Sequence, residues 1–421
     1  MKHVLLSFFF VLSQLILQAQ TVNVSTPAEL QNALNAATAG QTIVLAKGYY
    51  KKSGGFSVPV GISGTKNQPI ILQGAADVTI SSGSLTSGYG FYLQGNNNYW
   101  IIDGFHIRYS AKGIVSDSGC HNIISNLNVH FVGGEGIHLR SFSSYNKVEN
   151  CFVDSTGRDL PQWTGGYAEG IYVGSANSNW SKYTKGNPDT SNYNHITGNV
   201  FGDSIISENI DIKEGTKWGV VSNNTFNGKG LNGANSADSW VDAKGDYWTI
   251  ECNTGTFVKG LPGASATANG FQDHENSVSS FTYGHNNTFS NNTSNIDANQ
   301  YALYLHKTGM SIVCSNNTVT GGQLFKGTLA NCTNANSCMT TGIKNVNTKK
   351  YFSLYPNPAS TYIQVNGNLK TNYFITNVLG EVVKSGSTSN ENSVISIGDL
   401  NSGCYILNTT EEKNALKFIK E

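Results

Sequence analysis

A short repeat in the middle of the chain is the feature that most constrains the fold. An Asn recurs one or two places before a Phe or Val, or close to that pattern, at Asn126, Asn150, Asn199, Asn224, Asn253, Asn287 and Asn317. The successive gaps are 24, 49, 25, 29, 34 and 30 residues. This is the period of a solenoid in which one coil is doubled or enlarged by an insertion. A single compact core is therefore not expected.

A second series of short segments runs in step with the first. In each segment the second and fourth residues are mostly apolar and the third and fifth face outward, as in a strand with one buried face. These segments begin at Gly90, Gly113, Gly136, Gly170, Asn209, Trp240, Gly270 and Ala302. Coils with short strands and stacked turn asparagines predict an all-β fold, a right-handed parallel β-helix, over residues 21–345.

The start of the chain carries two further signals. Lys2 and His3 precede an apolar run from Val4 to Leu17, so residues 1–20 read as a signal peptide, too short for a membrane anchor. Thr26-Pro-Ala-Glu29 is a capping box with Pro at the first helical position. We expect a helix from there to about Ala37 that covers the open end of the solenoid.

Charge and cysteine content exclude several classes of protein. The 27 Lys and Arg balance 27 Asp and Glu, which argues against nucleic-acid binding and against a polybasic membrane anchor. Seven cysteines are few for a chain of this length, and an odd number cannot all pair, so a disulfide framework is not expected. Cys332 and Cys338 could still close a small loop. We expect an exported, monomeric protein.

The outward positions of the strands gather the candidate site residues. The third positions of the central strands give His138, Tyr172, Asp211, Asp242, Gln272 and Tyr304, and the fifth give Arg140, Lys213, Lys244, His274 and His306. Because adjacent coils stack about 4.8 Å apart, Asp211 should neighbour Asp242, and Lys213 should neighbour Lys244. Such convergence in a chain with only 13% charged residues favours a functional site over a solvated face.

The acidic pair has two functional interpretations. Asp211 and Asp242, with Glu208 or Glu214, could hold Ca²⁺ through oxygen ligands, or the pair could be the acid and base of a glycosidase. The basic neighbours suit an anionic substrate, and a paired Lys is expected to have a pKa lowered toward that of a general base. Lys213, Lys244, Asp211, Asp242 and His274 are the candidate catalytic residues, and the candidate substrate-binding residues are His138, Arg140, Tyr172, Gln272, Tyr304 and His306.

A long polar insert between Ser155 and Asn194 interrupts the repeat. Loops of this length are more often functional than not. Stacking of sugar rings on Trp163 or Trp180 is one interpretation, and packing of Trp180 on the solenoid is the other.

Two resemblances to known families add to this. Residues 351–421, with Tyr355-Pro-Asn-Pro and Leu400-Asn-Ser-Gly-Cys-Tyr405, resemble the C-terminal sorting domain of the type IX secretion system of Bacteroidota. This implies a small β-sandwich that directs export through that machinery to the cell surface or the medium. The solenoid, opening with Ala28-Glu-Leu-Gln-Asn-Ala-Leu34, resembles pectin-lyase-like β-helix proteins, with an entry like that of alginate and chondroitin lyases.

The resemblance implies a polysaccharide-degrading enzyme. Lys213 occupies a strand position similar to that of the basic catalytic residue of those lyases, and the implied reaction is β-elimination in a uronic-acid polymer. A glycoside hydrolase on the same fold and a non-catalytic glycan-binding surface protein are the alternatives. Elimination needs a cation to neutralise the carboxylate, a base for the C5 proton and an acid for the leaving oxygen.

Overall fold

The computed structural model describes the chain in segments. They are residues 20–158, 167–231, 237–257, 269–278, 281–297, 299–306, 310–326, 329–330, 353–355, 359–366, 371–377, 381–388, 392–409 and 415–421. The chain divides into two compact units, Met1–Cys338 and Met339–Glu421, and each is described by itself. Among the helices of these segments, none has the length and apolar character needed to cross a membrane.

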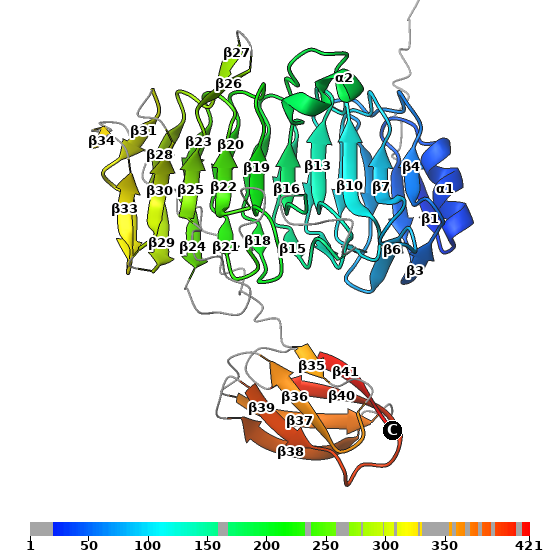
Figure 1. Ribbon diagram of the computed structural model, residues 1–421. Coiled ribbons are helices and arrows are strands. Elements are labelled where there is room, and N and C mark those ends of the chain that lie inside the picture. The colour runs from blue at the N-terminus through cyan, green and yellow to red at the C-terminus, as the bar shows by residue number, and fades with distance from the viewer. Residues whose placement is uncertain are drawn as a thin grey trace, which may run out of the picture. The chain divides into compact units, whose positions relative to one another are not determined.

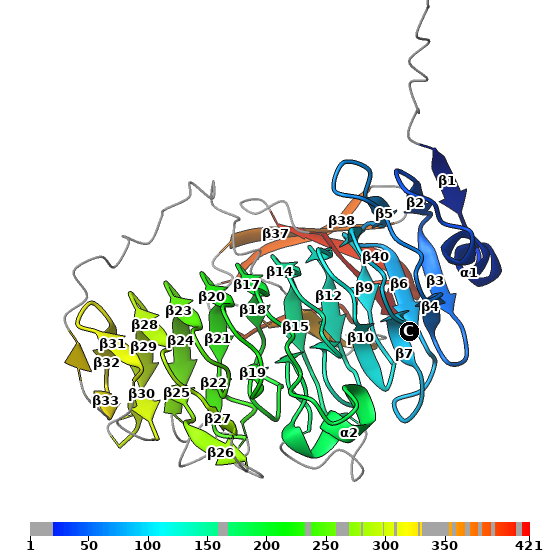
Figure 2. The same cartoon turned by 90° about the horizontal axis from the view of Figure 1, so that it is seen from above.

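Three long parallel sheets build the first unit, and each coil contributes one strand to each sheet in most of the stack (Figures 1 and 2). The first sheet has twelve strands: β1 (Thr21–Val24), β2 (Thr42–Leu45), β5 (Ile70–Gln73), β8 (Trp100–Asp103), β11 (Ile123–Ser125), β14 (Lys147–Glu149), β17 (His195–Thr197), β20 (Val220–Ser222), β23 (Thr249–Glu251), β28 (Thr288–Ser290), β31 (Ile312–Cys314) and β34 (Leu329–Ala330). The predicted right-handed parallel β-helix is confirmed.

The second sheet carries the candidate site and is called the site sheet. Its ten strands are β4 (Phe56–Val58), β7 (Tyr89–Leu93), β10 (Lys112–Asp117), β13 (Ile137–Arg140), β16 (Ile171–Val173), β19 (Ile210–Ile212), β22 (Ser239–Ala243), β25 (Asn269–Asp273), β30 (Tyr301–Leu305) and β33 (Gln323–Lys326). They lie side by side along the front of the stack in Figure 1.

The third sheet also has ten strands. They are β3 (Gly48–Lys51), β6 (Val78–Ser81), β9 (His106–Ile107), β12 (Asn128–His130), β15 (Phe152–Asp154), β18 (Val200–Phe201), β21 (Thr225–Asn227), β24 (Thr254–Phe257), β29 (Thr293–Ile296) and β32 (Thr318–Thr320). Between the three sheets, the inward side chains of successive coils form one continuous apolar core. Each coil buries its apolar face only against its neighbours, as a solenoid requires.

A ladder of buried asparagines joins the turns between the first and third sheets. The backbone N–H of each member donates to the side-chain oxygen of the next, at 2.9–3.1 Å, through Asn199, Asn224, Asn253, Asn292 and Asn317. Four of these were predicted from the repeat. Asn292 replaces the predicted Asn287, which instead accepts from the backbone of Trp248 in another turn.

The first helix covers the beginning of the stack. α1 (Pro27–Asn35) starts with the predicted capping box, in which Thr26 and Glu29 exchange side-chain and backbone hydrogen bonds of 3.2 Å. Its buried Leu30 and Leu34 pack into the core of the β-helix. The helix ends at Asn35, two residues before the predicted end.

Exposed and half-buried aromatic rings form an outer stack along the turns that follow the site sheet. The rings of successive coils stack with centroids 4.7–6.0 Å apart in the order Tyr99, His121, Tyr145, Tyr193, Trp218 and Tyr247. All six residues have a positive φ of 56–60°, which costs more for a bulky residue than for Gly. Stacking of the rings offsets part of this backbone strain.

The second unit is the small β-sandwich that the tail predicts. One antiparallel sheet contains β35 (Ser353–Tyr355), β36 (Tyr362–Asn366) and β39 (Asn392–Ser396), and the other contains β37 (Thr371–Asn377), β38 (Val382–Thr388), β40 (Gly403–Thr409) and β41 (Ala415–Lys420). Its core includes Ile363, Ile375, Leu407 and Phe418 and is separate from that of the β-helix.

The described cysteines include both disulfide-bonded residues and free thiols. Cys252 and Cys314 are disulfide-bonded, whereas Cys120 and Cys151 are free thiols. Cys332 and Cys338 lie outside the described residues.

Candidate active site

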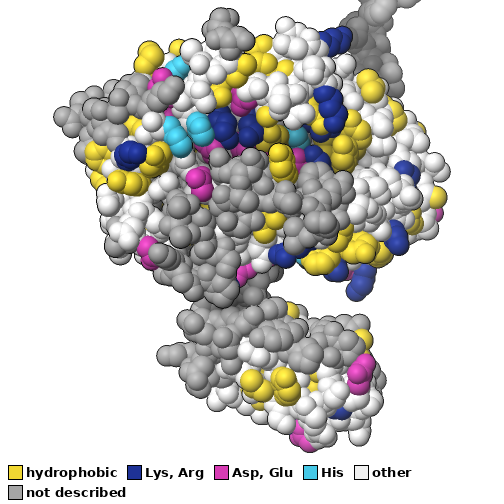
Figure 3. Space-filling view, in the orientation of Figure 1, with side chains coloured by type: hydrophobic (Ala, Val, Ile, Leu, Met, Phe, Trp, Pro, Cys, Tyr) yellow, Lys and Arg dark blue, Asp and Glu magenta, His cyan; other side chains and the backbone are white. Residues whose placement is uncertain are grey.

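The register of the site sheet brings the predicted outward residues together. Strand pairing places His138, Tyr172, Asp211, Asp242, Gln272 and Tyr304 next to one another on six consecutive coils. Lys213, Lys244, His274 and His306 immediately follow four of these strands. On the surface of this face, Lys and His side chains gather in one row with acidic groups beneath them (Figure 3).

Two lysines and two aspartates form the centre of this row. Lys213 Nζ lies 2.5 Å from Asp211 Oδ2, and Lys244 Nζ lies 2.5 Å from Asp242 Oδ2 and 3.3 Å from Asp211 Oδ1. The two carboxylates are only 1% exposed, while the ammonium groups reach the surface above them. The aspartates therefore face outward from the core without being solvated.

The charge state of Lys213 differs from the sequence-based expectation. Burial alone would lower the pKa of Lys213, but the charges of Asp211, Glu169 and Glu208 outweigh burial and raise this pKa well above its usual value. The pKa of Lys244 is also raised, because Asp211 and Asp242 outweigh its burial. The prediction of a lowered lysine pKa was wrong. The negative charges of the nearby carboxylates raise each lysine pKa by more than burial lowers it, and for Lys244 they also outweigh the positive charge of Lys213.

Three buried carboxyl groups meet at the edge of this network. Ligand oxygens of Glu169, Glu208 and Asp211 all lie within 4.8 Å of one another. Burial, then repulsion from Glu135 and Asp211, raises the pKa of Glu169 to about 8, and burial and Asp211 raise the pKa of Glu208 well above its usual value. The three residues form an acidic trio in which the Lys213 and Lys244 ammonium groups balance Asp211, and the two glutamates favour their protonated forms.

The predicted metal set is only partly brought together. Glu208 and Asp211 belong to the acidic trio, whereas Asp242 lies outside it and pairs with Lys244. Burial would raise the pKa of Asp242, but the positive charge of Lys244 outweighs burial and lowers this pKa. Glu214 is occupied elsewhere, since its Oε1 accepts a 2.5 Å hydrogen bond from the backbone N–H of Asn177.

Sequence reasoning identified Glu208 but missed Glu135 and Glu169, which form an acidic row with it at the start of the strands. Each of three consecutive strands of the site sheet, β13, β16 and β19, is preceded by a glutamate two residues before its start, namely Glu135, Glu169 and Glu208. The backbone carbonyls of Glu169 and Glu208 accept hydrogen bonds from the residue that follows the glutamate of the preceding coil. The signal is present in the repeats Glu135-Gly-Ile-His, Glu169-Gly-Ile-Tyr and Glu208-Asn-Ile-Asp. Reading each strand one residue earlier reveals a carboxylate on these three coils.

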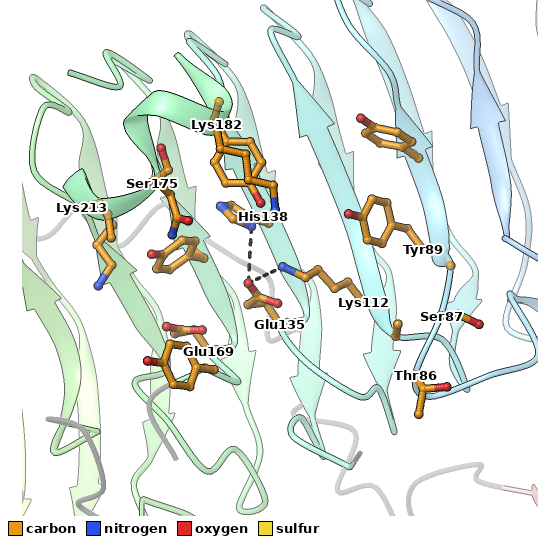
Figure 4. A pocket seen from close by; sticks show the side chains of 18 of the residues that line it. Thr86, Ser87, Tyr89, Lys112, Glu135, His138, Glu169, Ser175, Lys182 and Lys213 are labelled. Carbon is orange, nitrogen blue, oxygen red and sulfur yellow. Dashed lines mark hydrogen bonds and ion pairs between the residues drawn. The ribbon is translucent and has the colours of Figure 1, made fainter. Parts of the chain in front are cut away.

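A cleft of about 750 Å³ runs over the site sheet from β19 toward β7 (Figure 4). Lys213, Tyr172, Glu169 and His138 line it, together with residues from the earlier coils. Lys213 Nζ lies 5.1 Å from the ring centroid of Tyr172, and the His138 ring lies 4.4 Å from the Tyr172 ring. Burial, then the charge of Asp211, raises the pKa of Tyr172 well above its usual value, so its phenol stays neutral.

The remaining predicted residues lie on the coils beyond Lys244. The rings of His274 and His306 stack 4.0 Å apart, and His274 Nδ1 lies 3.6 Å from Asp242 Oδ2. His306 Nε2 is 2.7 Å from Gln272 Oε1, and burial with the charge of His274 lowers the pKa of His306 to about 4. Tyr304 accepts a 2.7 Å hydrogen bond from Lys326. These residues continue the row of polar side chains, but they are not among the residues that line the cleft.

The insert forms one wall of the cleft. It includes η1 (Asn177–Asn179) and α2 (Trp180–Tyr183), and Tyr183 and Lys182 line the cleft. Trp180 is buried, donates from Nε1 to the backbone of Ser175, and packs against Phe281. The packing interpretation of Trp180 is therefore supported, and Trp163 lies outside the described residues.

Arg140 contacts Tyr183 in this wall. It is 3% exposed, donates from Nε to Asp117 Oδ1 at 2.6 Å, and lies 4.2 Å from the Tyr183 ring centroid. It is not among the residues that line the cleft, and its direct contact with substrate stays a prediction.

The fold and this site define the class of protein, a parallel β-helix with a charged cleft along one sheet. A pectate lyase, Pel9A, shares the fold with a TM-score of 0.52 and 15% identity, covering 75% of this chain and 79% of its own. An alginate lyase from Paenibacillus sp. str. FPU-7 is 34% identical with a TM-score of 0.66, and the match covers 75% of this chain and 100% of that one. The chain belongs to the same family as this Paenibacillus lyase. No curated protein matches the chain.

The second unit is assigned independently. Residues 353–421 match the family described as the secretion system C-terminal sorting domain. The protein is therefore exported, and it is secreted or held at the cell surface.

Proposed function

We propose that the protein is a polysaccharide lyase that cleaves a uronic-acid polymer by β-elimination, with alginate as the first substrate to test. The observation that carries the proposal is the pair of Tyr172 and Lys213, a neutral phenol and an ammonium group 5.1 Å from the ring, in one cleft. The 34% identity to an alginate lyase supports it.

The protonation states suggest separate roles for the two residues. The Lys213 ammonium would bind the carboxylate of the substrate and neutralise its charge, which makes the adjacent C5 proton easier to remove. The Tyr172 phenolic oxygen would accept the C5 proton while its own proton passes to the leaving glycosidic oxygen. One proton is taken and one is given, so the phenol is regenerated as the C4–C5 double bond forms.

A hard cation such as Ca²⁺ is a candidate ligand of the acidic trio, and it would have to displace the ammonium groups that contact Asp211. Glu169, Glu208 and Asp211 offer only oxygen atoms, which is the ligand chemistry that Ca²⁺ prefers. When bound, the ion would supply positive charge for the substrate carboxylate beside Lys213. Without it, the trio relies on raised pKa values to limit repulsion among its members.

The hydrolase alternative that uses Asp211 and Asp242 has weaker support. A glycosidase needs one carboxylic acid that keeps its proton, but Asp211 and Asp242 are both paired with lysine ammonium groups. The pKa of Asp242 is lowered, because Lys244 outweighs its burial. Neither aspartate is placed as a general acid.

The test is ultraviolet absorbance during incubation with alginate and with other uronate polymers. Elimination creates an unsaturated, conjugated product, so absorbance should rise with the full-length protein and should not rise with Tyr172→Phe. Reducing ends released without absorbance would instead indicate a hydrolase. Binding without either signal would indicate a glycan-binding surface protein.

A further inference from the structure

The cleft is strongly asymmetric about the proposed centre. Lys213 marks one end, and the rest of the described lining lies on earlier coils, out to Tyr89 on β7 and the loop at Thr86 to Gly88. Adjacent coils are about 4.8 Å apart, so β10 lies about 14 Å from β19 along the stack. The cleft therefore has room for several sugar residues on the side of β10 and β7.

A second polar cluster lies in this distant part. Lys112 Nζ contacts Glu135 Oε1 at 2.6 Å, and His138 Nδ1 lies 3.5 Å from the same oxygen (Figure 4). The Glu135 and Lys112 side chains are 8% and 12% exposed, yet both line the cleft. A charged pair in this position has lost most of its hydration, so its remaining polar atoms need partners.

One atom of the cluster has no partner among the described residues. Glu135 Oε2 is buried and receives no hydrogen bond, whereas His138 Nδ1 faces the other carboxylate oxygen of Glu135 at 3.5 Å. The other ring nitrogen of His138 is committed to the backbone oxygen of Gly174 at 2.9 Å. Leaving a buried acceptor unsatisfied is unfavourable, which indicates that this part of the cleft is built to receive a donor from a ligand.

Aromatic rings flank the cluster. Tyr89 and Tyr92 lie edge to face with centroids 5.1 Å apart, and Tyr183 is held by the guanidinium of Arg140. All three tyrosines line the cleft. Apolar ring faces beside a charged hydrogen-bonding group are the combination that binds a sugar, which has apolar C–H faces and hydroxyl edges.

We propose that Lys112, Glu135 and Tyr89 form a distal subsite that binds a sugar residue of the substrate remote from the bond that is cut. A sugar hydroxyl donates to Glu135, and the ring rests against Tyr89. The inference depends on the proposed lyase function and adds to it: the enzyme uses binding energy from distant sugars, so long chains react faster than short ones.

The test compares initial rates on a uronate hexasaccharide and a trisaccharide. The trisaccharide is too short to extend from the centre to β10. Tyr89→Ala and Glu135→Gln should lower kcat/KM for the hexasaccharide by about ten- to hundredfold, the scale of one charged hydrogen bond or one stacked ring. The trisaccharide rate should change less than about twofold. Tyr89 is only half-buried, so this variant reports on the subsite even if Glu135→Gln fails to fold.

Lys326→Ala is the matched control. Lys326 lies on β33, on the far side of Lys213, and is exposed, so this variant should keep the wild-type ratio of hexasaccharide to trisaccharide rates. Equal losses on both substrates, or an unchanged ratio in the Tyr89 and Glu135 variants, would overturn the distal subsite alone. Failure of the wild-type protein to cleave any uronate chain would overturn the proposed lyase function instead.

Discussion

At the scale of single residues, Asp211 connects most of the site. It contacts both Lys213 and Lys244 and belongs to the acidic trio. One carboxylate thus holds two ammonium groups in place, and it is itself shielded from water. Asp211 and its neighbours could be predicted from the outward positions of the strands. Their charge states could not, because these depend on burial and on Glu169, which lies outside the five-residue pattern.

Replacing Lys213 tests the central cation. Lys213→Ala should lower turnover by at least about a hundredfold, because charge stabilisation of the developing enolate is lost. The melting temperature should also fall, because the buried Asp211 loses one of its two ammonium partners, so turnover is compared at a temperature where the variant remains folded. Ultraviolet assays and thermal unfolding check the two quantities, with the exposed Lys147→Ala on β14 as the control. Full activity of Lys213→Ala on a substrate that the wild-type protein cleaves would remove this residue from the centre.

Asp273 provides a prediction on pH. This inward carboxyl is 2% exposed, and burial raises its pKa from 3.8 to about 7. Because the folded state keeps the proton to higher pH, the contribution of Asp273 to stability is lost as the pH rises from about 4 through about 7. Asp273→Asn should therefore gain stability relative to the wild-type protein across that window, by up to about 4 kcal/mol.

Thermal unfolding at a series of pH values measures this difference. The variant keeps an oxygen acceptor for the Nδ2 group of Asn287, which lies 2.9 Å from Asp273 Oδ1. A gain that is the same at pH 4 and pH 8 would show that the carboxyl is not the titrating group.

At the scale of elements, the asparagine ladder shows what a repeat can and cannot predict. The spacing correctly identified Asn199, Asn224, Asn253 and Asn317 as stacked residues. The repeat selected Asn287 in place of Asn292 because Asn287-Thr-Phe fits the motif and Asn292-Thr-Ser does not. The coil between β23 and β28 is also lengthened by an extra hairpin, β26 (Asn276–Val278) and β27 (Phe281–Tyr283). Two asparagines then lie five residues apart, and only the backbone register decides which one joins the ladder.

Removing one member of the ladder should destabilise the coil stack. The side chain of Asn224 accepts from Asn199 and donates to the backbone of Ile196 and to Asn253. Asn224→Ala leaves buried backbone groups without partners, so we expect a loss of about 2–4 kcal/mol in the free energy of unfolding. Denaturant unfolding measures it, and the exposed neighbour Thr225→Ala should lose much less. Equal losses in both variants would contradict a special role for the ladder.

At the scale of the whole molecule, the β-helix and the tail have separate cores. Both were predictable, because a regular repeat and a specific C-terminal motif leave strong signals in the sequence. The cleft was less predictable. Its walls come from the insert and from loops of several coils, and their packing depends on contacts such as those of Asp189, which accepts hydrogen bonds from Ser141, Phe142, Ser175 and Ser191.

The separate cores lead to a prediction on export. Deleting residues 351–421 should leave the β-helix with its melting temperature and activity, because its core contains no residue from the tail. The truncated protein should remain inside the cell, since the sorting domain is removed. Fractionation of a producing strain, with immunodetection in cells and medium, checks this. Normal secretion of the truncated protein would refute the sorting role.

The outer aromatic stack also makes this molecule optically unusual. Trp218 is held between the rings of Tyr193 and Tyr247, so these chromophores are close enough for their transitions to couple and for excitation energy to pass from the tyrosines to the tryptophan. The difference between the wild-type protein and Trp218→Phe in near-ultraviolet circular dichroism and tryptophan emission would thus report on the spacing of the coils from β16 to β23, since the chain has five other tryptophans. Loosening of the middle of the solenoid would become visible without any added label.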